Sequence, residues 1–549
     1  MNAALILGGS ILVFLISYFT YGRYVSRLVG LDDSTITPAH KFSDGVDYVA
    51  APTPVVIGHH FASVAGAGPI VGPIIALYFG WLPGLLWILF GSVFVGAVHD
   101  FISLVASMRH EGRSVGCIIE RYIGRLGKKL FLIFSFSALI LVIAVFARIV
   151  VATLLKQPEV ATASVLFVAL ALIFGQAVNR FRVPLLPATI AGVALMALCV
   201  WIGITYPLLL SEKMWFAIVM IYIFLTSIAP VSLLLQPRDY LNSYLLIGVL
   251  IMAVFGIFVY QPTMAMPAFT SFNTELGLLF PMLFVTIACG AVSGFHSLVS
   301  SGTSSKQINR ESDARIVGYG SMLVEGVLAV VALITASYLA PSAFASLMPL
   351  KSPDPISVFA NGVGNFSTAL GIPVSTGVTF AAMAISSFAL TTLDTCVRLA
   401  RFAFQEYFTS SADEQKMTPW VNNPITGTAL AVGLGLAMAL SGGAGFLWPV
   451  FGASNQLLGA LALLAASVWL ERTGRKSLFV KIPMVIMFAI SLTALLIVAM
   501  KNIDAGNWII AALAVALFGF GSGLAALARV SLKKSVEPAS EELVPETNA

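Results

Sequence analysis

The chain has 549 residues, of which 58% are hydrophobic and only 10% are charged. A soluble domain carries about 25% charged residues, so this composition could not cover a water-facing surface. It excludes a soluble enzyme, a nucleic-acid-binding protein and a disordered scaffold. The mean hydropathy of +0.95 points the same way. The net charge of +5 is interpreted as loop charge on the cytoplasmic side of a membrane.

A helix that crosses a bilayer needs roughly 20 apolar residues, and about fifteen runs of that kind fill most of the chain. The sequence therefore predicts an all-α, polytopic membrane protein. The predicted spans lie at about 3–20, 56–79, 84–107, 130–153, 161–178, 185–205, 214–235, 241–260, 278–303, 316–339, 376–400, 425–441, 446–469, 482–500 and 507–528.

The charges between these runs alternate along the chain. Lys and Arg gather after the odd-numbered runs, as in MRHEGRSVGCIIERYIGRLGKK at 108–129, whereas loops after even-numbered runs carry few cations. Because cations hold loops in the cytoplasm, we expect the N-terminus outside and the C-terminus inside. The Pro- and Gly-rich stretch 341–375 is too broken to span and is expected to be external or re-entrant.

The chain is interpreted as one transmembrane domain over residues 1–529, followed by an acidic tail, 530–549, that is expected to be disordered in the cytoplasm. The four cysteines lie far apart and form no C-x-x-C, which predicts neither a disulfide framework nor a thiolate zinc site. The first apolar run lacks a basic leader and a cleavage site, so we expect it to be retained.

The second run is broken at its centre by Ala65, Gly66, Ala67, Gly68 and Pro69, with a further proline at 73. Prolines remove backbone donors and glycines permit unwinding. The pattern predicts two half-helices whose free carbonyls and amides bind substrate at membrane depth, as in secondary transporters. The alternative is a kink with tight glycine packing.

The run 214–235 contains Ala229 and Pro230 and lies five runs further on, with the opposite direction through the membrane. Two interrupted spans in this relation predict an inverted five-plus-five repeat. We expect its ten-helix core at about 56–405, with peripheral helices at 1–26 and 425–529. The unwound backbone around 228–231 would form the second half of the substrate site.

The run 278–303 carries a row of serines at three- and four-residue steps, which place them on one helical face. It would be the eighth helix of the core and would face the broken first one. Ser293, His296 and Ser297 are candidate substrate ligands, and Ser300, Ser301 and Ser304 are candidate ion ligands. Alternatively, the serines only allow close helix packing.

Three acids, Asp100, Glu325 and Asp394, fall inside apolar runs, where a carboxylate is costly unless it is paired, protonated or hydrated. Because histidine titrates near physiological pH, we predict proton coupling through these acids and His59, His60 and His99. Structural alternatives remain open: Asp100 and Asp394 could pair with Arg398 or loop cations, and Glu325 could cap a broken helix. His99 and Asp100 point about 100° apart on a helix, so they need not pair.

A metal site is the other interpretation of His59, His60, His99, Asp100 and His296. The spacing supplies no H-x-x-x-H or H-E-x-x-H, and we predict no metal and no cofactor. A metal-dependent membrane enzyme remains the rival from another class of protein.

Five segments resemble the carbon starvation protein CstA family. They are DGVDYVAAPTPVVIGHHFASVAGAGPIVGP (44–73), GAVHDF (96–101), LLQPRDYLNSYLL (234–246), SGFHSLVSSGTSSKQ (293–307) and LWPVFGASNQLLGALAL (447–463). His59 and His60 match the family's paired histidines, and Asp239 matches its QPRD motif. The resemblance implies a LeuT-like uptake carrier of the cytoplasmic (inner) membrane, related to the amino acid–polyamine–cation superfamily. It implies peptides as substrate and expression during starvation, and some relatives look like proton-coupled pyruvate carriers.

We therefore predict a secondary active importer of peptides that is coupled to protons. Sodium is the rival ion, and pyruvate or another small carboxylate is the rival substrate. The expected partners are the solute, the ion and the lipid bilayer, with no nucleic acid. The sequence predicts no oligomeric state.

Overall fold

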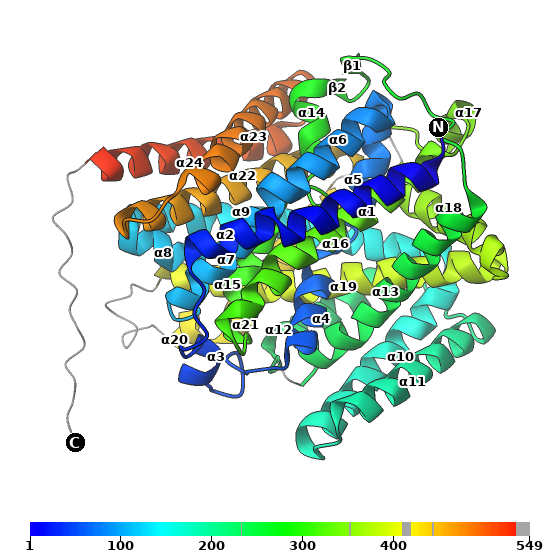
Figure 1. Ribbon diagram of the computed structural model, residues 1–549, viewed down its shortest axis with the longest axis horizontal. Helices are drawn as coiled ribbons and strands as arrows, with labels where there is room; N and C mark the ends of the chain where they lie inside the picture. Colours follow the sequence, from blue (N-terminus) through cyan, green and yellow to red (C-terminus); the bar gives the residue numbers. More distant parts are fainter. Residues whose placement is uncertain (232, 351–352, 409–418, 442–443, 534–549) are drawn as a thin grey trace.

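The computed structural model describes residues 1–549 except 232, 351–352, 409–418, 442–443 and 534–549. Within these residues the protein is a bundle of helices with one two-stranded ribbon (Figure 1). The first half contains α1 (Ala3–Phe19), α2 (Tyr21–Val29), α3 (Pro38–Lys41), α4 (Thr53–Val64), α5 (Gly68–Ile75), η1 (Ala76–Phe79), α6 (Trp81–Gly91), η2 (Ser92–Gly96), α7 (Ala97–Arg109), α8 (Val115–Tyr122), α9 (Arg125–Lys156), α10 (Pro158–Gly175), η3 (Gln176–Arg180), α11 (Leu185–Thr205), α12 (Glu212–Ile228) and α13 (Leu235–Tyr260).

The antiparallel ribbon follows, with Asn273 opposite Leu278 and Thr274 opposite Gly277. The second half contains β1 (Asn273–Thr274), β2 (Gly277–Leu278), α14 (Leu279–Thr286), α15 (Phe295–Gly302), η4 (Ser304–Lys306), η5 (Glu311–Asp313), η6 (Arg315–Gly320), α16 (Ser321–Ser337), α17 (Pro341–Leu347), α18 (Pro355–Ser367), η7 (Thr368–Leu370), α19 (Val374–Phe408), α20 (Pro419–Asn422), α21 (Pro424–Ser441), α22 (Ala444–Arg472), α23 (Leu478–Asp504) and α24 (Trp508–Lys533).

Among the described residues, twelve helices are long and apolar enough to cross a membrane, or thirteen if α4 and α5 count as one bent span. The two remaining predicted runs correspond to α12, which has 17 residues, and to α14 and α15, which have eight residues each. The broken stretch 341–375 forms the short helices α17 and α18 rather than a span. Residues 530–533 of the predicted tail continue α24, and 534–549 lie outside the described residues.

The predicted break in the second run is confirmed, because α4 ends at Val64, α5 begins at Gly68, and the two helices bend by 41°. Pro69 occupies the first turn of α5, where its missing N–H costs little. The chain between the two helices is therefore non-helical at Ala65–Ala67.

The prediction of a second interrupted span at 214–235 was wrong. Helix α12 ends at Ile228, and Ala229 is extended (φ −66°, ψ 151°), the conformation that a following proline imposes. Pro230 therefore ends a helix instead of breaking one. The second interruption lies in the run 278–303, between Thr286 and Phe295, so the serine-bearing segment is itself the second broken span.

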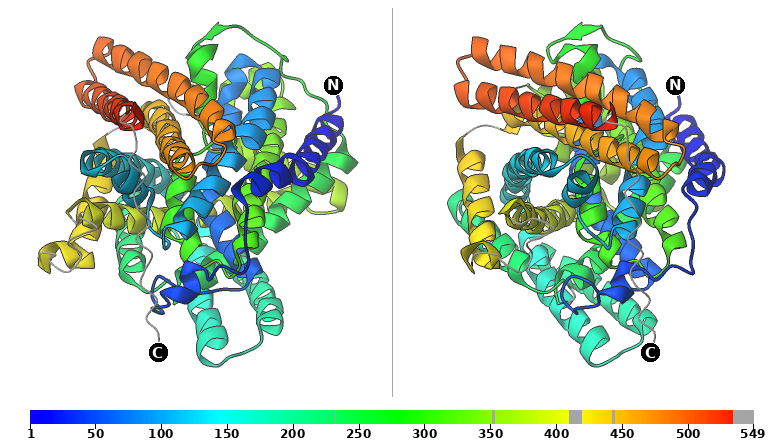
Figure 2. Two further views of the ribbon diagram at one scale, coloured as in Figure 1. Left: turned by 60° about the vertical axis from the view of Figure 1, so that its left-hand side comes forward. Right: turned by 90° about the vertical axis from the view of Figure 1, so that its left-hand side faces the viewer.

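The order of the helices still fits an inverted repeat once α10 and α11 are set aside. These two helices pack against each other and lie side by side at one edge of the bundle in Figures 1 and 2. Without them, the interrupted pair α14/α15 is the fifth segment after α4/α5, in the sequence α6–η2–α7, α9, α12, α13, α14/α15. In the predicted numbering the two interruptions are therefore runs two and nine rather than two and seven, and the serine-bearing run is the sixth segment of this order, not the predicted eighth.

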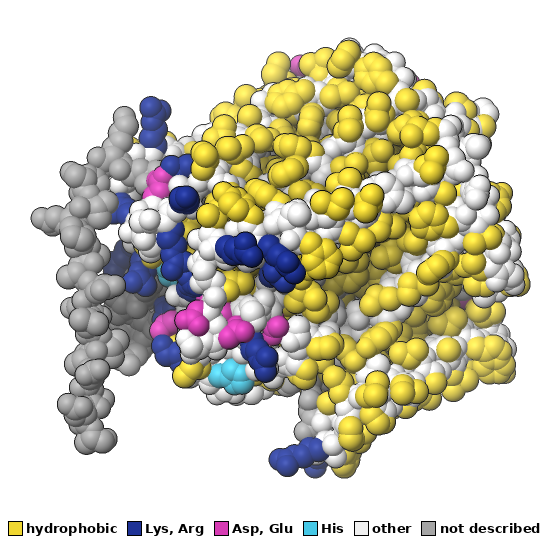
Figure 3. All heavy atoms as spheres, in the orientation of Figure 1, with side chains coloured by type: hydrophobic (Ala, Val, Ile, Leu, Met, Phe, Trp, Pro, Cys, Tyr) yellow, Lys and Arg dark blue, Asp and Glu magenta, His cyan; other side chains and the backbone are white. Residues whose placement is uncertain are grey.

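The surface separates into an apolar body and a charged end. Figure 3 shows hydrophobic side chains over most of the visible face, whereas Lys, Arg, Asp and Glu gather at the end that holds α3 and α8. The N-terminus lies away from this end (Figure 1). It is held beside the loop before β1, where Ala3 N–H donates to Pro262 O (2.9 Å). Helix α22 is deep in the bundle, with every residue of its apolar window buried.

Candidate functional site

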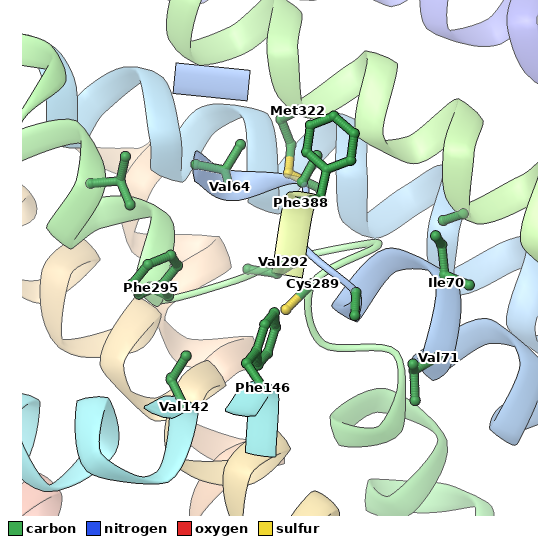
Figure 4. Packing of buried hydrophobic residues seen from close by; sticks show 14 of the residues in the cluster. Val64, Ile70, Val71, Val142, Phe146, Cys289, Val292, Phe295, Met322 and Phe388 are labelled. Atoms are coloured by element: carbon green, nitrogen blue, oxygen red, sulfur yellow. The ribbon is translucent and has the colours of Figure 1, made fainter. Parts of the chain in front are cut away.

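The two interruptions face each other inside the bundle. A Cβ added to Gly68 would lie 2.4 Å from Cys289 Sγ, and one added to Gly72 would lie 2.5 Å from Thr286 O. A Cβ added to Gly290 would lie 3.4 Å from Pro69 Cα, which is ordinary van der Waals contact. Figure 4 shows the apolar side chains around this meeting point, which include Cys289 between the breaks, Phe146 of α9 and Phe388 of α19. Glycine is required here because the two backbones touch.

The first interruption exposes backbone acceptors. Pro69 has no N–H, so the carbonyl of Ala65 lacks the partner that a continuous helix would give it. Gly66 N–H turns back to Val64 O (2.9 Å), and Ile70 and Val71 both donate to Ala67 O (3.2 and 2.9 Å). No described residue donates a backbone hydrogen bond to the carbonyls of Ala65 and Gly66. These two oxygens are candidate ligands for a solute or an ion.

Helix α19 holds the end of α4 in place. Thr392 Oγ1 donates to Ser63 O (3.1 Å), and Ser63 Oγ is 3.1 Å from Thr395 Oγ1. A Cβ on Gly66 would lie 2.6 Å from both Phe146 and Thr392. The sequence does not single out these threonines, because hydroxyls in a long apolar helix carry no signal until their neighbours are known.

The second interruption is closed by Asn455 of α22. Its Oδ1 accepts from Phe295 N–H (2.8 Å), its carbonyl accepts from Gly294 N–H (3.0 Å), and its Nδ2 donates to Ser293 Oγ (3.0 Å). The N-terminus of α15 is thus capped by the protein. Asn455 lies in one of the segments that carry the family resemblance, although no role had been assigned to it.

The predicted serine stripe is buried but its members do different things. Ser297 donates to Gly294 O and Ser301 donates to Ser297 O (both 2.7 Å), so both are used by their own helix. Ser304 bonds to His60 (2.8 Å). Among the described residues, the Ser300 hydroxyl has no hydrogen-bond partner.

Asp100 joins two histidines inside the bundle. Its Oδ1 accepts from His99 Nδ1 and its Oδ2 accepts from His296 Nδ1, both at 2.8 Å. The neighbours His99 and Asp100 therefore do pair, despite their angular separation on α7. His296 Nε2 points toward Glu325 Oε2 at 3.6 Å, which is too long for a hydrogen bond. All four side chains are fully buried.

Glu325 stands out within this cluster. Neither of its carboxyl oxygens has a hydrogen-bond partner among the described residues. The prediction that it could cap a broken helix finds no bond to support it. Its helix lies against the second interruption, since a Cβ on Gly290 would be 2.7 Å from Cβ of Ala329, one turn beyond Glu325.

The paired histidines tie α4 to two other elements. His59 Nδ1 donates to Asp239 Oδ2 of α13 (2.7 Å), and His60 bonds to Ser304 of η4. In the part of the chain that the structure describes, the Nε2 atoms of four histidines lack hydrogen-bond partners; they are those of His59, His60, His99 and His296. The QPRD motif was the signal for Asp239, whose partner only the fold reveals.

Asp394 belongs to a separate buried network. It accepts from Tyr222 and Thr226 (both 2.9 Å) and forms an ion pair with Arg238. The proposed partner Arg398 instead contacts Asp47 at 3.2 Å. Among the described residues, no group of three or more His, Cys, Asp and Glu side chains is arranged to hold a metal ion.

Two facing helix interruptions inside an apolar bundle are typical of secondary transporters. Solved structures of similar fold include a manganese transporter from Eremococcus coleocola, at 13% identity and a TM-score of 0.50 over 89% of this chain and 99% of that one. They also include MhsT in complex with L-phenylalanine, at 14% identity and a TM-score of 0.50 over 86% and 99%. These neighbours are LeuT-like transporters, and this chain is a multi-pass membrane protein.

The chain belongs to the carbon starvation protein CstA family, whose model matches residues 2–353 and 345–494. It is 33% identical to the "Peptide transporter CstA" of Escherichia coli K12, over 87% of this chain and 78% of the relative. It is 34% identical to the "Pyruvate/proton symporter BtsT" of the same organism, over 86% and 78%. It is also 33% identical to the Bacillus subtilis 168 "Peptide transporter CstA", over 84% of both chains.

Proposed function

We propose that this protein is a secondary active importer that carries short peptides across the cytoplasmic membrane together with protons, in cells short of carbon. The observation that carries the proposal is the fully buried Glu325, whose oxygens lack hydrogen-bond partners in the described chain. It lies 3.6 Å from His296 and beside the second interruption. A buried carboxyl group in this setting is costly when charged, so its protonation is tied to what occupies the neighbouring space.

The cargo would bind between the interruptions. A peptide ammonium group suits the free carbonyls of Ala65 and Gly66, because carbonyl oxygens are acceptors only. A carboxylate suits the N-terminal end of α5, where the helix dipole is positive. Because Pro69 has no N–H and those of Ile70 and Val71 donate to Ala67 O, the Gly68 N–H would be its donor there. The second helix end is unavailable, since Asn455 caps α15. Ala229 and Pro230 have no part in this arrangement, because they end α12.

Proton coupling would run through the Asp100–His296–Glu325 chain. Asp100 holds His296 by its Nδ1, which leaves Nε2 directed at Glu325. A proton on Glu325 removes the charge from the buried carboxyl, and a proton passed to His296 is stabilised by Asp100. Movement of α15, which carries His296, would then depend on the proton.

A sodium ion is the rival coupling ion, because the Ala65 and Gly66 carbonyls are oxygen ligands of the kind that hard cations take. Uptake into proteoliposomes separates the two. An inward proton gradient without sodium should drive accumulation of labelled dialanine. Uptake that needs sodium and ignores the proton gradient would overturn proton coupling.

Pyruvate is the second candidate substrate, favoured by the relative named as a pyruvate/proton symporter. Pyruvate has a carboxylate but no ammonium group, so it would use the α5 end and leave the Ala65 and Gly66 carbonyls unused. Competition between labelled dialanine, trialanine and pyruvate in the same vesicles decides between the substrates. Uptake of none of the three would reject both.

A further inference from the structure

A cavity of about 420 Å³ lies between α8, α9, α15 and α19, apart from the interruptions. Along α9 its lining passes from Lys128 to Leu139, a rise of about 16 Å at 1.5 Å per residue. The two other long walls also have a leucine at one end and a charged residue at the other, in the reverse order along the chain. They run from Leu298 to Lys306 and from Leu399 to Glu406. The cavity, called the funnel below, thus has Leu139, Leu298 and Leu399 toward one end and charged side chains toward the other.

The polar lining of the funnel is net cationic. Arg113, Lys128 and Lys306 line it with one carboxylate, Glu406, which accepts a hydrogen bond from Ser114. Outside the lining, Lys128 pairs with Glu120 (2.6 Å) and Arg113 lies 3.6 Å from Glu111, so the excess positive charge is that of Lys306. Such a lining attracts anions of small size rather than cations.

Lys306 is the most exceptional of these cations. Its ammonium lies over two rings, 4.8 Å from the centroid of Phe402 and 5.1 Å from that of Tyr48. Within the described residues it has no carboxylate oxygen inside 4.0 Å. Ser135, which is 1% exposed and lines the same funnel, has a hydroxyl without a hydrogen-bond partner in the described chain. A cation and a buried hydroxyl therefore face one space.

A second cavity of about 740 Å³ shares Arg113 and Cys117 with the funnel. Four more cations line it, together with Glu111 and Glu120; they are Lys41, Arg109, Arg121 and Arg125. The two cavities thus adjoin at Arg113 and Cys117, and cations line both of them.

We propose that the funnel is a carboxylate-binding site on the cytoplasmic side, which receives the cargo's carboxylate as it leaves, with the Lys306 ammonium as its principal ligand and the Ser135 hydroxyl as the second. It rests on the proposed function, because the carboxylate is that of the transported solute. The link to the interruptions is η4, a single turn that contains both Ser304, bonded to His60, and Lys306.

The test measures occupancy at the funnel without requiring transport. Cys117 lines it, and burial raises the pKa of its thiol to about 12, so its modification by a small maleimide is slow and is followed at about pH 9 by peptide mass spectrometry. Pyruvate and dialanine are added to purified protein in detergent, with sodium chloride at equal ionic strength as the reference.

Pyruvate and dialanine should slow Cys117 modification in the unmodified protein and in K306R. The concentration for half-protection should rise about tenfold in K306Q, the loss expected for one charge-assisted hydrogen bond, and about threefold in S135A. K476Q, which changes an exposed lysine outside the funnel, is the matched control and should behave like the unmodified protein. Absence of protection in the unmodified protein, or equal protection in K306Q, would overturn the proposal.

Transport is measured separately, so that the two proposals fail differently. In vesicles, K306Q should raise the internal concentration of solute that half-saturates counterflow, while the external half-saturation stays unchanged. If the unmodified protein transports neither probe, the proposed function fails, and the Cys117 experiment still decides whether the funnel binds carboxylates.

Discussion

At the scale of single residues, the buried acids that the sequence grouped together as candidates for proton coupling belong to two separate networks. Asp100, His296 and Glu325 lie beside the interruptions, whereas Asp394 is saturated by Arg238, Tyr222 and Thr226. Both carboxyl oxygens of Glu325 lack hydrogen-bond partners among the described residues, whereas both oxygens of Asp394 accept hydrogen bonds. Polar atoms without hydrogen-bond partners suit a role in proton transfer, whereas a fully hydrogen-bonded carboxylate suits a structural role.

The substitution Glu325→Gln tests the first network. An amide keeps the shape of the side chain but cannot release or take up the proton, so stimulation of uptake by an inward proton gradient should fall by about tenfold or more, while exchange at equal pH persists. Glu212→Gln, at the exposed start of α12, serves as control. Undiminished gradient stimulation in E325Q would remove Glu325 from the coupling.

The second network is expected to act on stability. Removing one partner of a buried ion pair leaves an uncompensated charge, which costs ~3–5 kcal/mol, so Arg238→Ala and Asp394→Ala should each lower the unfolding temperature in detergent. The double variant should lose less than the sum of the two, because no charge is left alone. Additive losses would show that the pair is not coupled.

At the scale of elements, the sequence marks the first interruption and hides the second. Pro69 and Pro73 with their glycines predict either an unwound segment or a kink at this place in the chain. Between Thr286 and Phe295 the residues are apolar or small and include no proline, so hydropathy continues through the break. Packing against α22 favours the break, because a Cβ on Gly294 would lie 2.0 Å from Asn455 O. Asn455 is 161 positions further along the chain, so the local sequence does not reveal this contact.

Pro230 misled for a related reason. A proline after a long apolar run has the same local signature whether it kinks a helix or ends it, and only the continuation of the chain distinguishes the cases. The helices themselves, the first break and the buried histidines and acids followed from composition and spacing. The hydrogen-bond partners of those groups depend on which helices pack together.

The contact of the two breaks can be tested directly. Gly68→Ala should destabilise the protein by ~1–3 kcal/mol through overpacking, because its Cβ would lie 2.4 Å from Cys289 Sγ and 2.5 Å from Cys289 Cβ. Adding Cys289→Gly should recover part of the loss, as measured by thermal unfolding in detergent. Gly9→Ala, where nothing lies within 4 Å, is the control. No recovery in the double variant would contradict the contact.

At the scale of the whole molecule, alternating charge and the fold agree on which elements share an end. The loop around residue 35 lies at the charged end, where Arg109 pairs with Glu311 (2.8 Å) and Asp32 N–H donates to Glu311. The ribbon of β1 and β2 lies away from it, near the N-terminus (Figure 1). From the positive-inside rule we expect the charged end to face the cytoplasm.

This assignment predicts opposite accessibility for two exposed positions, Thr35 and Asn273. With a membrane-impermeant maleimide, Asn273→Cys should be labelled in intact cells, whereas Thr35→Cys should be labelled only after the membrane is permeabilised. The native cysteines are buried or half-buried, so the unmodified protein sets the background. The reverse pattern would invert the bundle, and it would place the basic funnel at Lys306 on the side from which cargo enters. The topology therefore decides the role of the funnel. A cationic site for carboxylates can help to release imported cargo only if it opens to the cytoplasm.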